Sequence, residues 1–232
     1  MTTQELIKKF LDSNLMVDKE VVKEIVERDD THKYLLDIMK DDKYWDDYTW
    51  TQIHVFFILG LKRDDKAFEI LEYTITHRVE EMDDWITEDL PSILFSFGIK
   101  YFDNIKKIAF NTSLDMFVRI AALESLCAFG VVNNRLINEV AILCKQVLRE
   151  EKNKEIVALV LPNMAEVMDE ELFEMIKEFY KKNRDAKKVT DLQDLTELHN
   201  EKSSHPEYVH CTKNLWEHFS KENLNYLYKV NK

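Results

Sequence analysis

Three apolar segments of the chain each end at a glycine. The segments are IHVFFILG, SILFSFG and ESLCAFG, which end at Gly60, Gly98 and Gly130. Glycine is favoured just past the end of a helix, because a residue without a Cβ adopts the left-handed backbone at low cost. The pattern therefore predicts three helices that end at these glycines.

An amphipathic segment follows each glycine after a short turn. Asp65, Asp103 and Asn134 lie in these turns and are of the residue types that cap helix N-termini. The expected second helices are AFEILEYTI, NIKKIAF and RLINEVAILCKQVL. A fourth pair is IVALVLPNMAEVM followed by DEELFEMIKEFYKK, in which Met168 takes the place of the glycine.

The spacing of these pairs predicts the architecture. The repeats are separated by 38, 32 and 38 residues. Helix pairs that recur every ~30–45 residues are typical of an α-solenoid, and the variable spacing favours HEAT-like repeats over tetratricopeptide repeats, whose period is ~34 residues. We therefore predict an all-α, right-handed α-solenoid of HEAT-like helix pairs, with helical caps at both ends.

We expect a single domain over residues 1–232, because no low-complexity linker interrupts the chain. An N-terminal helical cap covers residues 1–44 and the repeat core covers residues 45–184. A C-terminal helical cap covers residues 185–232. The helices expected in the caps are Thr3–Ser13, Lys19–Arg28, Thr31–Met39 and Leu192–His199, followed by a terminal apolar pattern.

The run DWITEDLPSIL at residues 84–94 resembles a family of uncharacterised, mostly bacterial HEAT-repeat-like proteins of unknown function. Further similar stretches lie at residues 50–60, 62–67, 115–126 and 189–194. The resemblance implies a fold and no activity. Some members carry a C-terminal SEC-C zinc motif, which this chain lacks, so no zinc site is implied for it.

Composition and charge narrow the function. With 3 Gly and 3 Pro the chain can contain neither a dinucleotide fingerprint nor a phosphate loop. It has 32 basic and 44 acidic residues, and residues 1–98 alone carry 12 basic and 23 acidic residues, a net charge of −11. Acidic chains bind nucleic acid and anionic membranes poorly. We therefore expect a protein or peptide partner of basic character.

The sequence indicates no secretory signal and no apolar run of the ~20 residues that span a bilayer, so we expect a cytoplasmic protein. Four histidines and one cysteine crowd into 20 residues near the C-terminus, but their spacing lacks the paired ligands of zinc sites. These residues are His199, His205, His210, Cys211 and His218. We assign no metal, no cofactor and no catalytic residue.

The segment from Asp41 to Trp50 contains four aromatic residues and four aspartates. A second Trp/Asp group lies in the matching loop one repeat later, and stacked repeats place equivalent loops side by side. Tryptophans surrounded by carboxylates suit a basic partner, although the rings alternatively seal the loop against the core. The predicted partner-binding residues are Trp45, Asp46, Asp47, Trp50, His54, Asp83, Asp84 and Trp85.

His54 has two interpretations. It is either a general base oriented by a nearby aspartate, or a half-buried residue that packs the first repeat. The second is favoured, because no nucleophile is tied to His54 by spacing. At the edge of a binding surface, His54 would make partner binding sensitive to pH.

We therefore interpret the chain as a non-enzymatic protein–protein interaction scaffold. The alternative is an enzyme on a HEAT-like scaffold, of the DNA glycosylase or bilin lyase type, by analogy of fold alone. A glycosylase needs a basic concave face, which the net charge disfavours. A bilin lyase needs a chromophore pocket, which no motif indicates.

Overall fold

The chain forms α-helices and short 3-10 helices, without a strand in the part that the structure describes. The structure is a computed structural model that describes residues 1–45, 50–167, 169–201 and 211–230. It divides into two compact units, residues 1–83 with 213–232, and residues 84–212. The all-α prediction is confirmed. Met168 and most of the expected loop after His199 lie outside the described residues.

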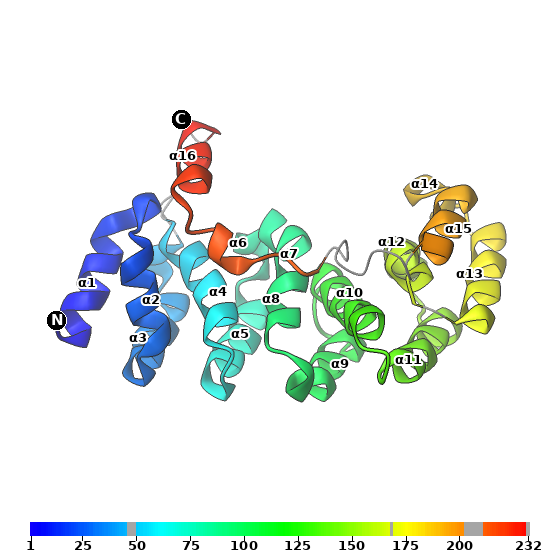
Figure 1. Ribbon diagram of the computed structural model, residues 1–232, viewed down its shortest axis with the longest axis horizontal. Helices are drawn as coiled ribbons and strands as arrows, with labels where there is room; N and C mark the ends of the chain where they lie inside the picture. Colours follow the sequence, from blue (N-terminus) through cyan, green and yellow to red (C-terminus); the bar gives the residue numbers. More distant parts are fainter. Residues whose placement is uncertain (46–49, 168, 202–210, 231–232) are drawn as a thin grey trace. The chain divides into compact units, whose positions relative to one another are not determined.

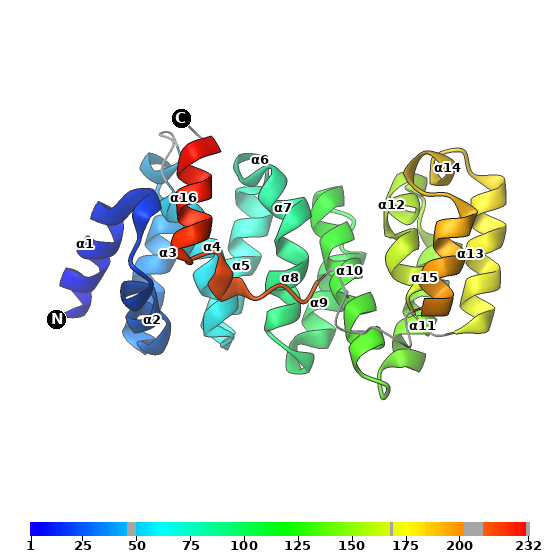
Figure 2. The same cartoon turned by 45° about the horizontal axis from the view of Figure 1, so that its top comes forward.

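In the first unit, most contacts between α-helices join neighbours in the chain or helices separated by one other helix. Its helices are α1 (Thr3–Ser13), η1 (Asn14–Met16), α2 (Lys19–Glu27), η2 (Asp29–Thr31), α3 (His32–Lys40), η3 (Asp42–Tyr44), α4 (Thr51–Lys62), α5 (Asp65–His77) and α6 (Val79–Met82), joined by η6 (Leu215–Glu217) and α16 (Lys221–Val230). Helix α4 contacts α2, α3 and α5, and α3 also contacts α5 (Figure 1). The C-terminal segment returns to this unit, where η6 packs on α4 and α16 on η1 (Figure 2).

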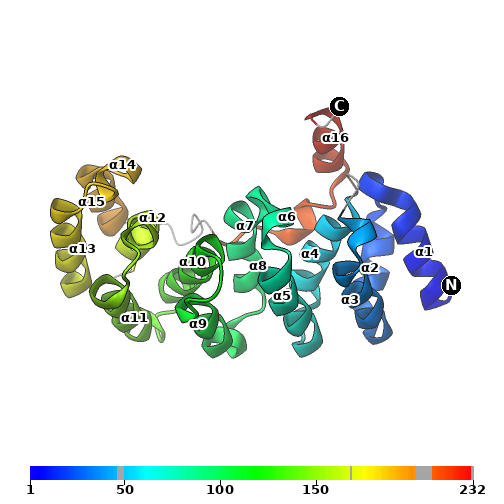
Figure 3. The ribbon, with the colours of Figure 1, turned by 180° about the vertical axis from the view of Figure 1, so that it is seen from behind.

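The second unit is organised around α10. Its helices are α7 (Asp84–Glu88), α8 (Leu90–Ser96), η4 (Ile99–Tyr101), α9 (Phe102–Phe110), α10 (Met116–Val132), α11 (Ile137–Glu150), α12 (Lys154–Ala165), α13 (Glu170–Lys182), α14 (Ala186–Val189) and α15 (Leu192–Glu201). Helix α10 contacts α7, α8, α9, α11 and α12 (Figure 3). Helix α13 packs on both α11 and α12, and α15 packs on α12.

The two most apolar helices are the most enclosed. Every residue of α4 from Thr51 to Leu61 is buried, as are most residues of α10. The flanking helices bury one face only, which agrees with their amphipathic sequences. The apolar runs of the sequence therefore mark the centre of each unit, and the amphipathic runs mark its outer helices.

Side-chain caps set where several helices begin. The N-cap residues whose side chains accept a backbone N–H of the first turn are Thr2, Asp18, Asp64, Asp115, Asn153 and Asp169. The prediction of Asp65 as a cap is thus wrong by one residue. Asp103 and Asn134 do not cap at all, because α9 and α11 begin at Phe102 and Ile137 without a side-chain cap.

The predicted role of the glycines holds at one position of three. Gly98 follows α8 with φ 82°, whereas Gly60 and Gly130 lie inside α4 and α10. Arg63, with φ 58°, closes α4 in the left-handed conformation instead. Gly130 serves packing, because a Cβ at this position would lie 2.9 Å from Cβ of Val140 on α11. Its missing side chain lets α10 and α11 approach closely.

Among the described helices, none combines the length and the apolar character needed to cross a bilayer.

Gly130→Ala should lower the free energy of unfolding by ~1–3 kcal/mol, because the added methyl group overlaps Val140. Combining it with Val140→Ala should cost less than the sum of the two single changes, since the loss of Cγ1 and Cγ2 removes two of the three close contacts of the added methyl group and leaves only the contact with Cβ. Urea unfolding of the wild-type, single and double variants measures this coupling. Strict additivity would contradict the packing role assigned to Gly130.

Candidate functional site

Trp45 lies just after η3 and is held in place from two sides. Its ring is half-buried, and the indole Nε1–H donates to the carbonyl oxygen of Met39 at 3.2 Å. The guanidinium carbon of Arg78 lies 5.4 Å from the ring centroid, within the range of a cation–π contact. The ring therefore has a fixed orientation while part of it remains accessible.

Arg78 connects the end of α3 to α6. Its guanidinium donates to the carbonyl oxygens of Met39 and Lys40, and it forms ion pairs with Asp42 at 2.5 Å and Glu81 at 3.2 Å. The hydrogen bond to Asp42 is the main cause that raises the pKa of Arg78. We call Trp45, Arg78, Asp42 and Glu81 the Trp45 surface. Sequence reasoning missed Arg78, because Glu81 is the only local one of these partners, whereas Asp42 and the carbonyls of Met39 and Lys40 lie 36–39 residues away.

The other predicted residues have varied positions. Asp46 and Asp47 lie outside the described residues. Trp50 is half-buried at the start of α4, and its backbone N–H donates to Oδ1 of Asn14 at 3.0 Å. Asp83 is exposed, with φ 44° after α6.

Asp84 and Trp85 belong to a helix and not to the predicted loop. They open α7, in the second unit, where a carboxylate in the first turn is favoured by the helix dipole. The run DWITEDLPSIL is divided into α7 and α8 because Pro91, at the start of α8, lacks the N–H that an uninterrupted helix needs. That the two Trp/Asp groups form one surface stays a prediction.

The structure corrects the placement of His54, which is fully buried and does not reach the surface. Its ring lies among Phe10, Trp50 and Phe219, with centroid distances of 5.5–6.4 Å. Its Nδ1 lies 2.9 Å from Nε2 of His218, on the C-terminal segment. His54 thus helps to join α4 to that segment, as a core residue.

The hydrogen bonds of His54 define a neutral ring. Nε2 lies 3.1 Å and 3.2 Å from the carbonyl oxygens of Asn14 and Leu15, so Nε2 carries the proton and donates it. Nδ1 is then the acceptor for the Nε2–H of His218. Burial lowers the pKa of His54 to about 4, and burial together with His54 lowers the pKa of His218 well below its usual value.

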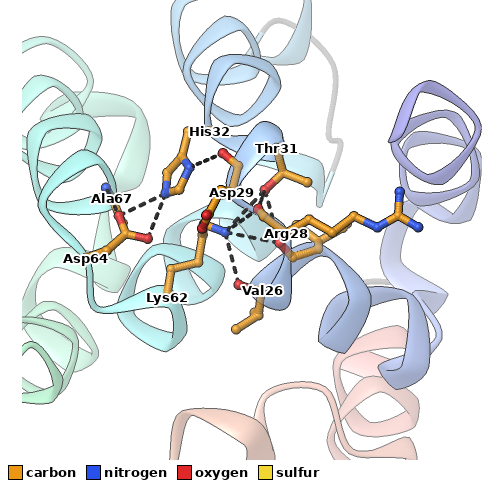
Figure 4. A network of polar contacts seen from close by, with 9 residues as sticks. Val26, Arg28, Asp29, Thr31, His32, Lys62, Asp64 and Ala67 are labelled. Atoms are coloured by element: carbon orange, nitrogen blue, oxygen red, sulfur yellow. Dashed lines mark hydrogen bonds and ion pairs between the residues drawn. The ribbon is translucent and has the colours of Figure 1, made fainter. Parts of the chain in front are cut away.

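Lys62, at the end of α4, closes the C-terminus of α2 (Figure 4). Its ammonium group donates to the carbonyl oxygens of Ile25, Val26 and Arg28 at 2.9–3.2 Å, and to the hydroxyl of Thr31 at 3.2 Å. The last carbonyls of a helix lack partners within it, so a cation at this end satisfies both hydrogen bonding and the helix dipole. Burial lowers the pKa of Lys62.

His32 lies beside this cap and joins α3 to α5 (Figure 4). Its Nδ1 lies 2.6 Å from the carbonyl oxygen of Asp29, and its Nε2 lies 2.9 Å from both carboxylate oxygens of Asp64. Both ring nitrogens therefore lie within hydrogen-bond distance of oxygen atoms, one on η2 and the others at the start of α5. Asp64 also caps α5 through the N–H of Ala67 at 2.8 Å.

A cavity of about 400 Å³ opens next to His32, between α3 and α5. Its volume falls within the ~300–1,000 Å³ range of small-molecule sites. The lining residues are Asp29, Asp30, His32, Lys33, Leu36, Lys66, Glu69 and Ile70. Three basic and three acidic side chains share its wall, so the charge selects no particular class of ligand.

The second unit contains two carboxyl groups with unusual electrostatics. Burial raises the pKa of both Glu124, on α10, and Glu166, just after α12, to about 7, and Glu166 adds to the shift of Glu124. Carboxyl groups that titrate near neutral pH occur often at functional sites. Sequence reasoning missed this pair, because only the fold brings α10 and α12 together.

The two C-terminal histidines that the structure describes, His199 and His218, have different partners. His199 stacks on Phe173 in the second unit, with its Nε2 3.1 Å from Oε1 of Glu170, whereas His218 contacts His54 in the first. His205 and His210 lie outside the described residues. In the described part of the chain, no cluster of three or more His, Cys, Asp or Glu residues is arranged to hold a metal ion.

These observations define an all-α protein whose two units are each built from packed helices. The chain belongs to the family described as protein of unknown function DUF1186, whose model matches residues 1–215. Searches of curated proteins and of solved structures found no match. Membership confirms the expectation of an uncharacterised family and assigns no activity.

Lys62→Met should lower the free energy of unfolding by ~1–3 kcal/mol, because three partly buried carbonyls at the end of α2 lose the hydrogen bonds of the ammonium group and the Thr31 hydroxyl reaches only those of Ile25 and Arg28. Lys66→Met is the matched control, since Lys66 is exposed on the neighbouring α5 and should change stability by less than ~0.5 kcal/mol. Urea unfolding of both variants measures the difference. Equal effects would contradict the capping role.

Acid should weaken the fold through His54. A folded-state pKa of about 4, below the unfolded value of 6.5, leaves stability intact above pH 6.5 and removes it as the pH falls towards 4. The loss from this group is about 3 kcal/mol, from the shift of about 2.5 pKa units. The measurement is the free energy of unfolding against pH for the wild type and His54→Gln, whose curve should be flatter. His77→Gln, at an exposed histidine, should keep the wild-type slope.

Proposed function

We propose that this protein is a non-enzymatic protein–protein interaction scaffold, a right-handed HEAT-like α-solenoid with helical caps. The alternating contacts within each unit support this. In the first unit α2 packs on α4 and α3 on α5, and in the second α10 packs on α8 and α12 while α11 packs on α13. Contacts between equivalent members of successive helix pairs are those that a stacked repeat requires.

The proposed partner is a basic protein or peptide that binds at the Trp45 surface. The observation that carries this proposal is the fixed, half-buried ring of Trp45 beside the exposed carboxylate of Asp42. A ring that is already fixed loses little conformational freedom on binding, and tryptophan is enriched among the residues that dominate interface energies. Surrounding carboxylates favour lysine and arginine on the partner.

In the first unit we also propose Asp46, Asp47, Trp50 and Asp83 as partner-binding residues, and we exclude His54 because it is buried. Asp84 and Trp85 belong to the second unit and are proposed as partner-binding residues there, separately from the Trp45 surface. The same acidic character supports our proposal that the protein binds neither nucleic acid nor membranes. We further propose that it acts in the cytoplasm, where the thiols of its free cysteines are kept reduced.

Trp45→Ala should abolish recovery of the partner from an extract of the source cells while the melting temperature stays within a few degrees of wild type. If the ring instead seals the loop against the core, the same change should cost ~3–5 kcal/mol of stability. Pull-down with quantitative mass spectrometry and thermal unfolding of the same samples separate the two outcomes. A strongly lowered melting temperature, or recovery of the same partner in unchanged amount, would contradict the proposal.

Charge provides a second, independent measurement. Glu81→Gln should weaken binding of the recovered partner, and the remaining affinity should depend less on salt, because one carboxylate of the surface is lost. Glu178→Gln is the matched control, since Glu178 is an exposed carboxylate on α13 in the other unit. Equal effects of the two changes would indicate that net charge, and not this surface, attracts the partner.

A further inference from the structure

Two cysteines that lie 17 residues apart in sequence are in contact inside the second unit. Sγ of Cys127 on α10 and Sγ of Cys144 on α11 are separated by 3.7 Å, and both residues are buried, with exposed fractions of 1% and 3%. Both are free thiols. From the sequence, each cysteine is expected to be an ordinary core residue. Only the packing of α10 on α11 reveals that the two thiols are in contact.

The close approach of the two helices explains this contact. Cys127 lies one turn before Gly130 on α10, and Cys144 lies one turn after Val140 on α11. Gly130 and Val140 meet where a Cβ on the glycine would come within 2.9 Å of Val140. Since α11 runs back along α10 after a short turn, the cysteines face each other one turn away from this point.

We propose that Cys127 and Cys144 are a redox-active pair that closes to a disulfide when a hydroperoxide oxidises the protein. A disulfide requires an S–S distance of about 2.05 Å. Bringing the sulfur atoms together from 3.7 Å requires rotation of two short side chains, on helices that already approach closely.

The reaction balances with the hydroperoxide as the only oxidant. One thiolate attacks the peroxide oxygen, which gives a sulfenic acid and releases an alcohol, or water from hydrogen peroxide. The second thiol then attacks the sulfenic sulfur, so that the S–S bond forms and water leaves. Two thiols and one hydroperoxide thus give one disulfide, one alcohol and one water. A small thiol reverses the closure by exchange.

The surroundings favour this pair over deeper oxidation. The contact with Cys144 and burial raise the pKa of the Cys127 thiol well above its usual value, so the first step is slow. Once a sulfenic acid forms, the second thiol is already in contact and intercepts it. A third buried thiol, Cys211, packs beside Ala128 and is the competitor for this step.

The test exposes the intact protein to hydrogen peroxide at about pH 8, where more thiol is ionised. Remaining thiols are then alkylated, and the products are mapped by mass spectrometry. Before alkylation, we expect the mass to lie two hydrogen atoms below that of the reduced protein. After alkylation, we expect a Cys127–Cys144 cross-linked peptide and Cys211 recovered in alkylated form. Cys211→Ser should give the same cross-link, whereas Cys144→Ser should not.

Three results would overturn the proposal. They are a cross-link that includes Cys211, complete alkylation of all three thiols after treatment, and a cross-link that forms only in urea. Thermal unfolding adds a second readout. The closed disulfide holds α10 to α11 across their turn, so the oxidised wild type should melt at a higher temperature than the reduced form. Cys144→Ser should show no such difference.

Discussion

The C-terminal ends of three packed helices, α2, α3 and α9, depend on one recurring interaction, in which a basic side chain from elsewhere in the unit binds the last carbonyls. Lys62 binds the last carbonyls of α2, Arg78 those of α3, and Arg119 the carbonyl of Ala109 in α9. A buried carbonyl without a donor costs ~1–3 kcal/mol, so a helix that ends inside a packed unit needs such a partner. Each cation also connects two helices, which fixes how they pack.

The same interaction positions the proposed binding surface. Hydrogen bonds to the carbonyls of Met39 and Lys40 position the guanidinium group of Arg78. In that position, it contacts the ring of Trp45 and pairs with Asp42. A side chain that closes a helix thus also orders a surface residue. His54, in contrast, orders no surface residue, because its ring is fully buried and its hydrogen-bond partners lie inside the unit. Its titration therefore acts on the stability of the fold.

The helices could be predicted from sequence because they depend on local pattern. The bounds of α1 agree with the prediction to the residue, and α2, α3, α5 and α13 agree to within two residues. The predicted helix ends at Gly60 and Gly130 are wrong, because both glycines lie inside helices. A glycine inside a helix can be required by close packing against a residue that lies elsewhere in the chain. Gly130 is explained by Val140, and nothing within the run ESLCAFG shows that contact.

The site was less predictable, because its interactions join distant parts of the sequence. His54 and His218 are 164 residues apart, and Arg78 is 36 residues from Asp42. Trp45 could be selected from composition alone, as a tryptophan in an acidic segment. The side chains that hold it could not, since an arginine at the end of an amphipathic helix has the same local pattern whether it faces solvent or a carbonyl.

These basic residues at helix ends bear on how much of the net charge a partner meets. Residues 1–98 contain 12 basic side chains against 23 acidic ones. Lys62 and Arg78 are bound to backbone carbonyls, and Arg28 binds the carbonyl of Met1 and pairs with Glu24. Arg78 and Arg28 also pair with Asp42 and Glu24, so each of these cations balances a carboxylate near it. The excess of acidic side chains in residues 1–98 remains, and exposed carboxylates such as Asp83 belong to it, which supports the argument for a basic partner.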